Sequence, residues 1–301
     1  MPAPRVSVII PVRDQPDFLA ESLASVFHQP FRDLEVIVVD DGSTVDLQSA
    51  LAPFAGRVRV ERQAPLGVAA ASNRGAALAI GDVLAFHDAD DLMEPSRIVI
   101  PLPVLDSDPA LALVFGNGLK VTADLRLIGP VIPARQAIRL ARRGLSLAEL
   151  VRRSHIYLQA SLVRRSIFLE RGGLPSFHAG GDWGFALRCV AHHPVAFVDH
   201  ALFRYRQHGT SLTAGRVAMA EAAVAILRDF VAREPAAAAR LGKRTMARAL
   251  ALRLARLAAQ EERAGDADAA RAHLREATHL VPWGLRYRLR LLGAGRRTPS
   301  R

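Results

Sequence analysis

The first two thirds of this 301-residue chain predict an α/β fold, in which a mostly parallel, Rossmann-like sheet is flanked by helices. Apolar runs of strand length alternate with helical patterns between Val6 and Phe86, and this order is typical of parallel strands joined by right-handed crossovers. Two acidic clusters, Asp40–Asp41 and Asp88–Asp91, directly follow apolar runs. Half of the residues are hydrophobic, so the chain can bury a substantial core.

The elements of this first part follow from apolar spacing and from turn residues. The strands are predicted at residues 6–12, 35–39, 58–61 and 83–86, and the helices at 18–27 and 68–80. Ligands of such sheets bind beyond the carboxyl ends of the strands, which is where both acidic clusters fall. We therefore expect the binding site at this edge.

The next part of the chain changes character. Short apolar runs and turn residues between 111 and 132 predict a mixed or antiparallel continuation of the sheet. Beyond it, helices are predicted at residues 145–153, 162–171 and 182–192, followed by a strand at 195–198.

From about residue 213 the composition shifts to Ala, Arg and Leu, which predicts an all-helical C-terminal extension. We therefore expect two domains, residues 1–212 and 213–301. Within the second, residues 258–282 read as a helix–turn–helix unit with its turn at Gly265–Asp266. This unit is similar to a single tetratricopeptide-like hairpin.

The net charge of +11 lies almost entirely in this extension. Residues 213–301 carry 18 basic and 8 acidic side chains, whereas residues 1–212 carry 22 and 21. A basic helical tail can meet an acidic lipid surface, nucleic acid or an acidic partner, and it can also be a set of solvated helix faces. The residues that could form a membrane-surface helix are Trp283, Tyr287, Leu289, Leu291 and Leu292, among Arg286, Arg288 and Arg290.

Cys189 is the single cysteine, which excludes an internal disulfide and fits a reducing compartment. No apolar stretch of signal-peptide length follows the first residues, and no run of 18 apolar residues occurs. We therefore expect a cytoplasmic protein, with a peripheral position at the inner membrane face as a further expectation.

Asp88 and Asp90 carry the clearest chemistry. In an extended segment residues i and i+2 face the same way, so both carboxylates can reach one ligand while Asp91 points elsewhere. Two carboxylates together with phosphate oxygens suit Mg²⁺ or Mn²⁺. A nucleotide diphosphate held by such a cation would give these acids the partners that acids next to buried strands need.

Residues 5–212 resemble the family 2 glycosyltransferases, whose fold is called GT-A. The resemblance lies in the first strand with Leu23, Ser25, Val26 and Gln29 after it, and in Glu35–Thr44. It continues through Gly67, Asn73–Gly75, Gly81–Asp82 and Asp88–Asp91. The family implies a nucleotide-sugar donor, a divalent metal and transfer of the sugar to an acceptor.

The resemblance also implies roles for individual residues. Nucleotide-sugar binding is carried over onto Pro11, Val12, Asp14, Asp40, Asp41, Gly42, Gly67, Asn73, Asp88 and Arg206. The metal ligands would be Asp90 and His208, the latter in a segment, Arg204–Ser211, that looks like the family's Tyr-Arg-X-His-X-X-Ser ending. Ser72 stands where some family patterns have an Arg, which puts one cationic contact to the nucleotide in doubt.

Asp182 is the candidate general base, because Gly180–Trp183 occupies the place of the family's Glu-Asp-Trp or Glu-Asp-Tyr motif. An acceptor hydroxyl needs such a base at neutral pH. Gly181 stands where an acid is usual, which leaves open a different acceptor or weaker tuning of Asp182. Trp183 could stack on the acceptor or belong to the core.

The resemblance therefore implies an inverting, metal-dependent glycosyltransferase that acts on a hydroxyl of a glycan or lipid-linked acceptor, and we expect no nucleic-acid partner. Gly-X-Gly-X-X-Gly after the first strand and Gly-X4-Gly-Lys-Ser/Thr are both absent, which argues against dinucleotide oxidoreduction and nucleoside triphosphate hydrolysis. Two alternatives remain: a non-catalytic nucleotide-sugar or glycan-binding protein, and a membrane-surface adaptor that acts through the basic tail.

Overall fold

The structure is a computed structural model, and it describes residues 3–177, 179–208 and 215–293. The described residues divide into two compact units. The first contains those of 1–146, 154–176 and 181–209, and the second those of 147–153, 177–180 and 210–301. The expected boundary near residue 212 stays a prediction, because two short earlier segments also belong to the second unit.

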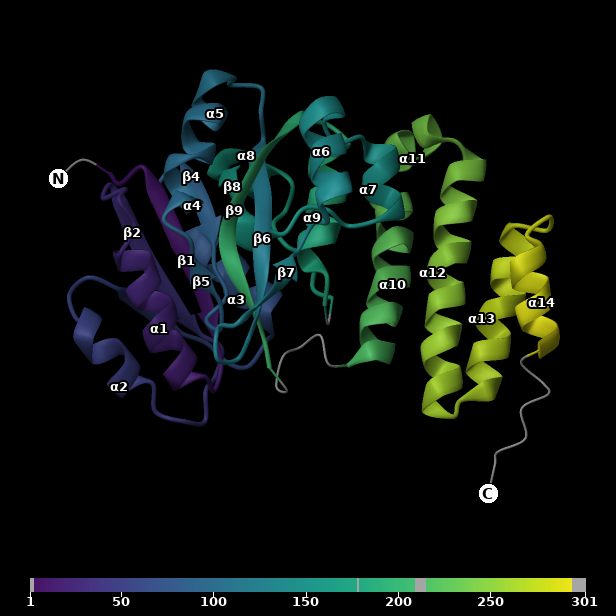
Figure 1. The fold of residues 1–301 in the computed structure, drawn as a ribbon, viewed down its shortest axis with the longest axis horizontal. Helices are drawn as coiled ribbons and strands as arrows, with labels where there is room; N and C mark the ends of the chain where they lie inside the picture. The colour runs from purple at the N-terminus through teal and green to yellow at the C-terminus, as the bar shows by residue number, and fades with distance from the viewer. Residues whose placement is uncertain (1–2, 178, 209–214, 294–301) are drawn as a thin grey trace. The chain divides into compact units, whose positions relative to one another are not determined.

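The first unit is built on a nine-stranded sheet with helices packed on it (Figure 1). Its strands are β1 (Val6–Val12), β2 (Leu34–Asp40), β3 (Arg59–Arg62), β4 (Val83–Phe86), β5 (Leu92–Met93), β6 (Leu113–Thr122), β7 (Leu127–Pro130), β8 (Ser161–Arg164) and β9 (Val195–Gln207). The helices are α1 (Pro16–Phe27), α2 (Gln48–Leu51), α3 (Val68–Leu78), α4 (Ser96–Val99), α5 (Pro101–Ser107), α6 (Ala134–Arg143), α8 (Arg165–Glu170) and α9 (Gly181–Val190). Short 3-10 turns occupy η1 (Ala52–Phe54) and η2 (Leu158–Ala160).

The strand order is β3-β2-β1-β4-β8-β6-β9-β5, with β7 paired to β6. The pairings among β3, β2, β1 and β4 are parallel, as predicted. Beyond β4 the sheet is mixed, because β8 runs antiparallel to both of its neighbours while β6 and β9 are parallel. The predicted mixed or antiparallel continuation is therefore confirmed.

Alternation along the strands gives the sheet two buried faces. On one face Val8 and Ile10 of β1 pack into a core with Leu19 and Leu23 of α1. On the other face Ile9 lies so close to α3 that a Cβ at Gly75 would stand 2.4 Å from its side chain. Burial of both faces explains why β1, β2 and β4 read as continuous apolar runs.

One helix prediction was wrong in its first residues. The segment predicted as a helix from residue 162 to 171 begins as the strand β8, and α8 starts only at Arg165. The strand is favoured because Leu162 and Val163 pair with both β4 and β6 in the centre of the sheet.

Every regular element described in the second unit is a helix. It contains α7 (Leu147–Arg152), α10 (Arg216–Arg233), α11 (Pro235–Leu241), α12 (Lys243–Ala264), α13 (Ala267–Leu280) and α14 (Leu285–Gly293). The predicted turn lies between α12 and α13: Gly265 adopts φ +89° at the end of α12, and Asp266 caps α13 by accepting a hydrogen bond from the Ala269 N–H at 3.0 Å. Among the described residues, no helix is both long enough and apolar enough to cross a bilayer.

Candidate functional site

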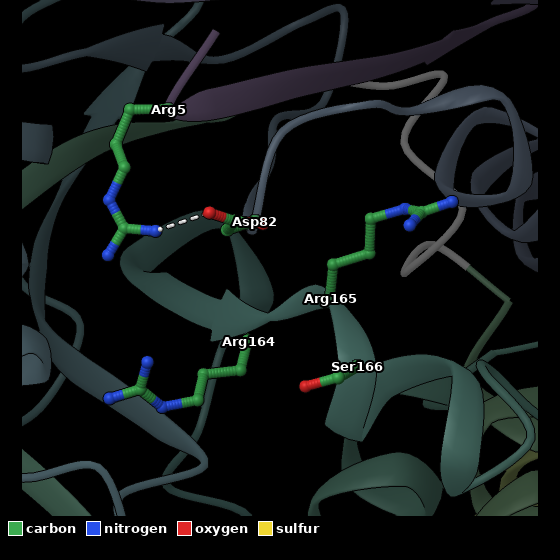
Figure 2. A pocket seen from close by; sticks show the side chains of 5 residues that line it. All are labelled: Arg5, Asp82, Arg164, Arg165 and Ser166. Carbon is green, nitrogen blue, oxygen red and sulfur yellow. Dashed lines mark hydrogen bonds and ion pairs between the residues drawn. The ribbon is translucent and has the colours of Figure 1, made fainter. Parts of the chain in front are cut away.

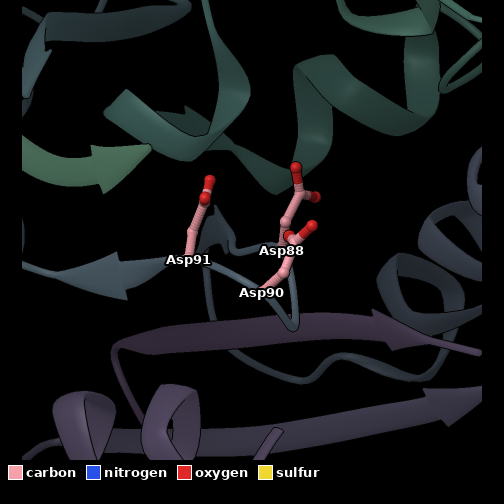
Figure 3. Close-up of side chains that lie close together, drawn as sticks. All are labelled: Asp88, Asp90 and Asp91. Carbon is pink, nitrogen blue, oxygen red and sulfur yellow. The ribbon is translucent and has the colours of Figure 1, made fainter. Parts of the chain in front are cut away.

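The loop after β4 brings three carboxylates together. Asp88, Asp90 and Asp91 each offer an oxygen, and these oxygens lie within 4.8 Å of one another. Figure 3 shows the three side chains on the same side of the loop. The segment is a turn, in which the Asp91 N–H donates to the Asp88 carbonyl at 3.2 Å. The prediction that Asp91 points elsewhere was wrong, because it assumed an extended chain.

Asp91 is fully buried. Its Oδ1 accepts a hydrogen bond from the backbone N–H of Arg206 at 2.9 Å, and within the described chain its buried Oδ2 has no hydrogen-bond partner. Burial, followed by the charges of Asp88 and Asp90, raises the pKa of Asp91 well above its usual range. A buried carboxylate oxygen without a donor is unfavourable, and a cation would offset that cost.

Asp88, which is part of this loop, contacts η2 through its side chain. Its Oδ2 accepts a hydrogen bond from the side-chain amide of Gln159. Burial, followed by the charge of Asp90, raises its pKa to about 7, and the charge of Asp182 adds to this increase. The candidate base on α9 therefore lies within electrostatic reach of the acidic loop.

His208, which directly follows β9, lies beside Asp90. Its Nε2 lies 2.8 Å from Oδ2 of Asp90, and its ring centroid lies 4.7 Å from that of Phe18. The side chain of His208 is 7% exposed and that of Asp90 is 20% exposed. Gly209 to Ser211, the last part of the predicted motif, lie outside the described residues.

These residues fit a divalent cation. Carboxylate oxygens with one imidazole nitrogen form a donor set that suits Mn²⁺, while Mg²⁺ prefers the oxygens. The partnerless oxygen of Asp91 and the raised pKa values of Asp88 and Asp91 indicate that their ionised forms are unfavourable unless a cation lies beside them. Asp88, Asp90 and Asp91 offer it three oxygens close to one another, and metal binding by Asp90 and His208 stays a prediction.

Asp182 lies in the first turn of α9 and is half-buried. Its Oδ1 accepts a hydrogen bond from the backbone N–H of Trp183 at 2.7 Å. Burial raises its pKa to about 6, although this hydrogen bond opposes the shift. A carboxyl with such a pKa can take a proton near neutral pH.

The two neighbours of Asp182 are closely packed. A Cβ at Gly181 would lie 3.3 Å from the Pro175 carbonyl oxygen and 3.6 Å from the Leu174 Cβ. Trp183 is 4% exposed, which favours a packing role for it. Contact between Trp183 and the acceptor stays a prediction.

A second group of predicted residues lies where β1 and β2 end. Pro11 and Val12 are buried within β1, and β1 lies between β2 and β4 in the sheet. Asp14, at φ +55°, joins the two loops, because its Oδ1 accepts hydrogen bonds from the backbone N–H groups of Thr44 at 2.6 Å and Val45 at 3.2 Å. These bonds, the first above all, lower the pKa of Asp14. Both predicted groups thus lie at the same edge of the sheet.

Asp40 and Gly42 shape the turn after β2. The Asp40 Oδ1 accepts a hydrogen bond from the Ser43 N–H at 2.8 Å, and its Oδ2 lies 3.4 Å from Nη1 of Arg62. Gly42 has φ +72°, and a Cβ there would stand 2.8 Å from Cδ of Pro65. Only glycine fits this position without a shift of its neighbours.

Asp41 is buried and ties the loop after β3 to the end of β2. Its Oδ1 accepts from the Gln63 side-chain amide at 2.8 Å and from the Leu66 N–H at 2.9 Å, and its Oδ2 accepts from the Gly67 N–H at 2.8 Å. These contacts place Gly67, at φ +93°, directly before α3. Direct contact of Asp41 or Gly67 with a nucleotide stays a prediction.

Asn73 lies on α3, where its amide is engaged on both sides. Its Nδ2 donates to the Leu174 carbonyl at 2.8 Å, and its Oδ1 accepts from the Leu174 N–H at 2.7 Å. The adjacent Gly173 carbonyl accepts from the buried Arg188 of α9. Asn73 therefore holds the loop that leads toward Asp182, and this contact favours positioning over the predicted nucleotide binding.

Arg206 is 3% exposed at its side chain, where it pairs with Glu21. Its guanidinium carbon also lies 4.7 Å from the ring centroid of Phe18. These contacts hold β9 against α1 and, through the backbone N–H, against Asp91. Contact between Arg206 and a diphosphate stays a prediction.

Three polar residues near the acidic loop escaped the sequence reasoning. Gln159 contacts Asp88, and the buried Arg97 donates to the carbonyls of Phe86 and Ser161. The buried His87 adjoins Asp88 in the chain, and burial, followed by the charge of Arg97, lowers its pKa to about 3. The sequence shows only that a polar residue stands among apolar ones, and this does not indicate which residue it contacts.

A cavity of about 300 Å³ lies elsewhere (Figure 2). Its lining residues are Arg5, Asp82, Arg164, Arg165 and Ser166. Arg5 and Asp82 precede β1 and β4, so this cavity lies at the amino ends of these strands, opposite the acidic loop. It is therefore separate from the candidate site.

Known proteins are similar to this chain in sequence. The family model described as Glycosyl transferase family 2 matches residues 7–169. An uncharacterized glycosyltransferase of Rickettsia felis is 36% identical over 106 residues, which cover 35% of this chain and 18% of that protein. A PGL/p-HBAD biosynthesis glycosyltransferase of Mycobacterium bovis is 30% identical over 197 residues, which cover 64% of this chain and 72% of that protein.

Solved structures share the fold at low sequence identity. S. aureus TarS in complex with UDP-GlcNAc is 16% identical with a TM-score of 0.70, covering 96% of this chain and 89% of that chain. The mannosyltransferase PcManGT of Pyrobaculum calidifontis, in complex with GDP-Man and Mn²⁺, is 20% identical with a TM-score of 0.61, covering 98% and 85%. This agreement confirms the GT-A type of fold. With a family match over more than half of its residues, the chain belongs to glycosyl transferase family 2.

Proposed function

We propose that the protein transfers a sugar from a nucleoside-diphosphate sugar to a hydroxyl group, with inversion at the anomeric carbon. The observation that carries this proposal is the cluster of Asp88, Asp90 and Asp91, with His208 beside Asp90 and Asp182 within electrostatic reach, in a chain of this family. The complexes of TarS with UDP-GlcNAc and of PcManGT with GDP-Man support a nucleotide-sugar donor.

The donor would lie along the carboxyl ends of β1, β2 and β4. The loops held by Asp14, Asp40 and Asp41 would receive the base and the ribose, and Asp88 would face the ribose or the sugar. Asp90 and His208 would hold Mn²⁺ or Mg²⁺, in line with the Mn²⁺ in the PcManGT complex. Such a cation, when bound, stabilises the negative charge of the departing diphosphate.

In the proposed step Asp182 accepts the proton of the acceptor hydroxyl. The acceptor oxygen forms a bond to the anomeric carbon from the side opposite the leaving group, and the bond to the diphosphate oxygen breaks with its electron pair. One base suffices for this single displacement, which inverts the carbon. The raised pKa of Asp182, about 6, matches the demand for a base near neutral pH.

The direct test is turnover of a panel of uridine, guanosine, thymidine and cytidine diphosphate sugars with Mn²⁺ present. We expect release of the nucleoside diphosphate from at least one donor, and transfer when a suitable hydroxyl acceptor is added. Tight donor binding without hydrolysis or transfer, across glycan and lipid-linked acceptors, would favour the non-catalytic binding protein instead. Gly181, where an acid is usual, is the residue that motivates that second candidate.

The acceptor and the location are further parts of the proposal. We propose a glycan or lipid-linked acceptor, and a cytoplasmic protein that contacts the inner membrane face through its basic helical extension. The 18 basic and 8 acidic residues of positions 213–301 support an anionic partner for this extension.

A further inference from the structure

The last described helix, α14, is apolar on two sides. Its inner side carries Tyr287, which is 2% exposed, and Leu291, and both pack against the core of the second unit. Spacings of four and three residues place Leu285, Leu289 and Leu292 on the other side of the helix. A helix needs only one apolar side to pack on its own core, so the other side calls for a separate explanation.

This other side is strongly exposed. Leu285 is 66% exposed, Leu289 58% and Leu292 73%, and Trp283, just before the helix, is 59% exposed. Helices at the end of a stack usually present a polar outer face, because an apolar one lowers solubility. Large apolar side chains gathered on a surface indicate a site of association. We name the four residues, together with Arg286 and Arg288, the outer face of α14.

The charge of this face limits what can cover it. Arg286 and Arg288 are exposed, and residues 277–293 contain no acidic side chain. Arg290 is engaged on the inner side, where it donates to the Ala255 carbonyl at 2.7 Å and to Oε2 of Glu262 at 2.9 Å. The outer face therefore presents leucines, a tryptophan and uncompensated positive charge.

A second copy of the chain fits this face poorly. A two-fold contact brings the same surface of both copies together, so the arginines of one face would approach those of the other without intervening acids. An anionic bilayer meets both features, because leucines and tryptophan partition into the interface while arginines attract acidic headgroups.

We infer that the outer face of α14 docks the protein onto an anionic membrane surface. The inference deepens the membrane contact of the proposed function and rests on that part of it, while remaining independent of the transfer chemistry. The face differs from the one expected from the sequence: Tyr287, Leu291 and Arg290 belong to the inner side, and Leu285 joins the outer one.

Sedimentation of the full chain with phospholipid vesicles tests the inference. We expect binding to vesicles of phosphatidylcholine with one quarter phosphatidylglycerol, weaker binding as salt is raised, and little binding to phosphatidylcholine alone. The double variant Leu285→Ser/Leu289→Ser should bind at least about tenfold more weakly. Arg288→Gln should bind about fivefold more weakly at low salt.

The matched control is Leu169→Ser/Val231→Ser, which removes two exposed aliphatic side chains on α8 and α10. This variant should bind vesicles like the wild type. Equal binding of the wild type to neutral and anionic vesicles would overturn the inference. A loss of vesicle binding in the control as large as that in Leu285→Ser/Leu289→Ser would also overturn it. A concentration-dependent dimer that is lost in Leu285→Ser/Leu289→Ser, without vesicle binding by the wild type, would also overturn it.

The thermal shift caused by a nucleotide sugar with Mn²⁺ is measured on the same samples. All of these variants should keep the wild-type shift, because they lie outside the candidate site. A wild type that responds to the donor but ignores anionic vesicles would refute the docking face and leave the transferase standing. A wild type that binds anionic vesicles through the outer face but responds to no donor would support the inference and count against the proposed function.

Discussion

Nε2 of His208 lies 2.8 Å from Oδ2 of Asp90, although 118 positions separate the two residues in the chain. Two ligand atoms in adjacent positions around one octahedral cation, each about 2.1 Å from it, lie about 3 Å apart. The separation is that of a hydrogen bond, and two ligands of a shared cation can also adopt it. Asp88 and Asp91 offer further carboxylate oxygens beside this pair, and a cation would favour the ionised forms that their raised pKa values disfavour.

Loss of either residue should weaken metal binding. We expect His208→Ala and Asp90→Asn to lower the affinity for Mn²⁺, in the presence of a nucleoside diphosphate, by at least about 10- to 100-fold. Titration calorimetry measures this change. The control is Asp82→Asn, because Asp82 is an exposed carboxylate at the opposite edge of the sheet. An affinity that stays constant in both site variants would place the cation elsewhere.

Asp182→Asn should separate chemistry from donor binding. The amide cannot accept the acceptor proton, so the transfer rate should fall by about 10²- to 10⁴-fold. The donor affinity should stay within about twofold, since Asp182 is proposed to act on the acceptor. Steady-state kinetics and a donor titration provide the two readouts. If the donor affinity is lost instead, Asp182 belongs to the donor site.

The pH dependence of kcat/KM should report Asp182 directly. Burial raises the pKa of this carboxyl from 3.8 to about 6, and the base must be deprotonated. We therefore expect kcat/KM to be half-maximal near pH 6 and to fall about tenfold for each unit below it. The residual activity of Asp182→Asn should not show this decrease below pH 6.

Unfolding driven by protonation of Asp182 would not explain a decrease of kcat/KM below pH 6. A raised pKa means that the folded protein binds this proton more readily than the unfolded chain. The contribution of Asp182 to stability therefore increases as the pH falls from about 6 toward 3.8. If kcat/KM of Asp182→Asn decreases below pH 6 in the same way, the titrating group is another residue.

Asn73→Ala should lower the free energy of unfolding by about 1–3 kcal/mol, because the N–H and the carbonyl of Leu174 both lose their partner. Urea denaturation measures this change. Arg74→Ala is the control, since the exposed ion pair of Arg74 with Glu61 contributes at most about 1 kcal/mol. An Asn73→Ala variant of unchanged stability that no longer binds the donor would restore the predicted nucleotide contact.

Two glycines with positive φ should respond differently to alanine. Gly67→Ala adds strain at φ +93° but meets no atom within 4 Å, whereas Gly42→Ala adds strain at φ +72° and places its Cβ 2.8 Å from Pro65. We expect Gly42→Ala to lower the free energy of unfolding by about 1–3 kcal/mol more than Gly67→Ala. Thermal and urea unfolding of both variants provide the comparison. Equal decreases in the free energy of unfolding would show that Pro65 can move away from the new Cβ with little loss of stability.

The parallel part of the sheet could be predicted because its strands are buried on both faces. β1, β2 and β4 appear as continuous apolar runs, so the acids that follow two of them fall at the expected edge. β8 could not be predicted, because four residues whose pattern also suits a helix become a strand only through pairing with β4 and β6.

The candidate site, like the fold, could be predicted only in part. Asp88 and Asp90 were proposed from their place after a buried strand, and Asp182 and His208 from motifs that resemble those of the family. The contact of Gln159 with Asp88 spans 71 positions and leaves no trace in local spacing. The position of Asp91 was misjudged for a related reason, since a turn and an extended segment can share one acidic sequence.

The most direct test of the account is the thermal shift of the wild-type protein with a nucleotide sugar, measured with Mn²⁺ and again with a chelator. The account predicts a clear stabilisation when donor and Mn²⁺ are present together, and its loss with the chelator or in Asp90→Asn. A stabilisation of equal size without the cation and in Asp90→Asn would contradict it, because the donor would then be held without the cation that the acidic loop and His208 are proposed to bind.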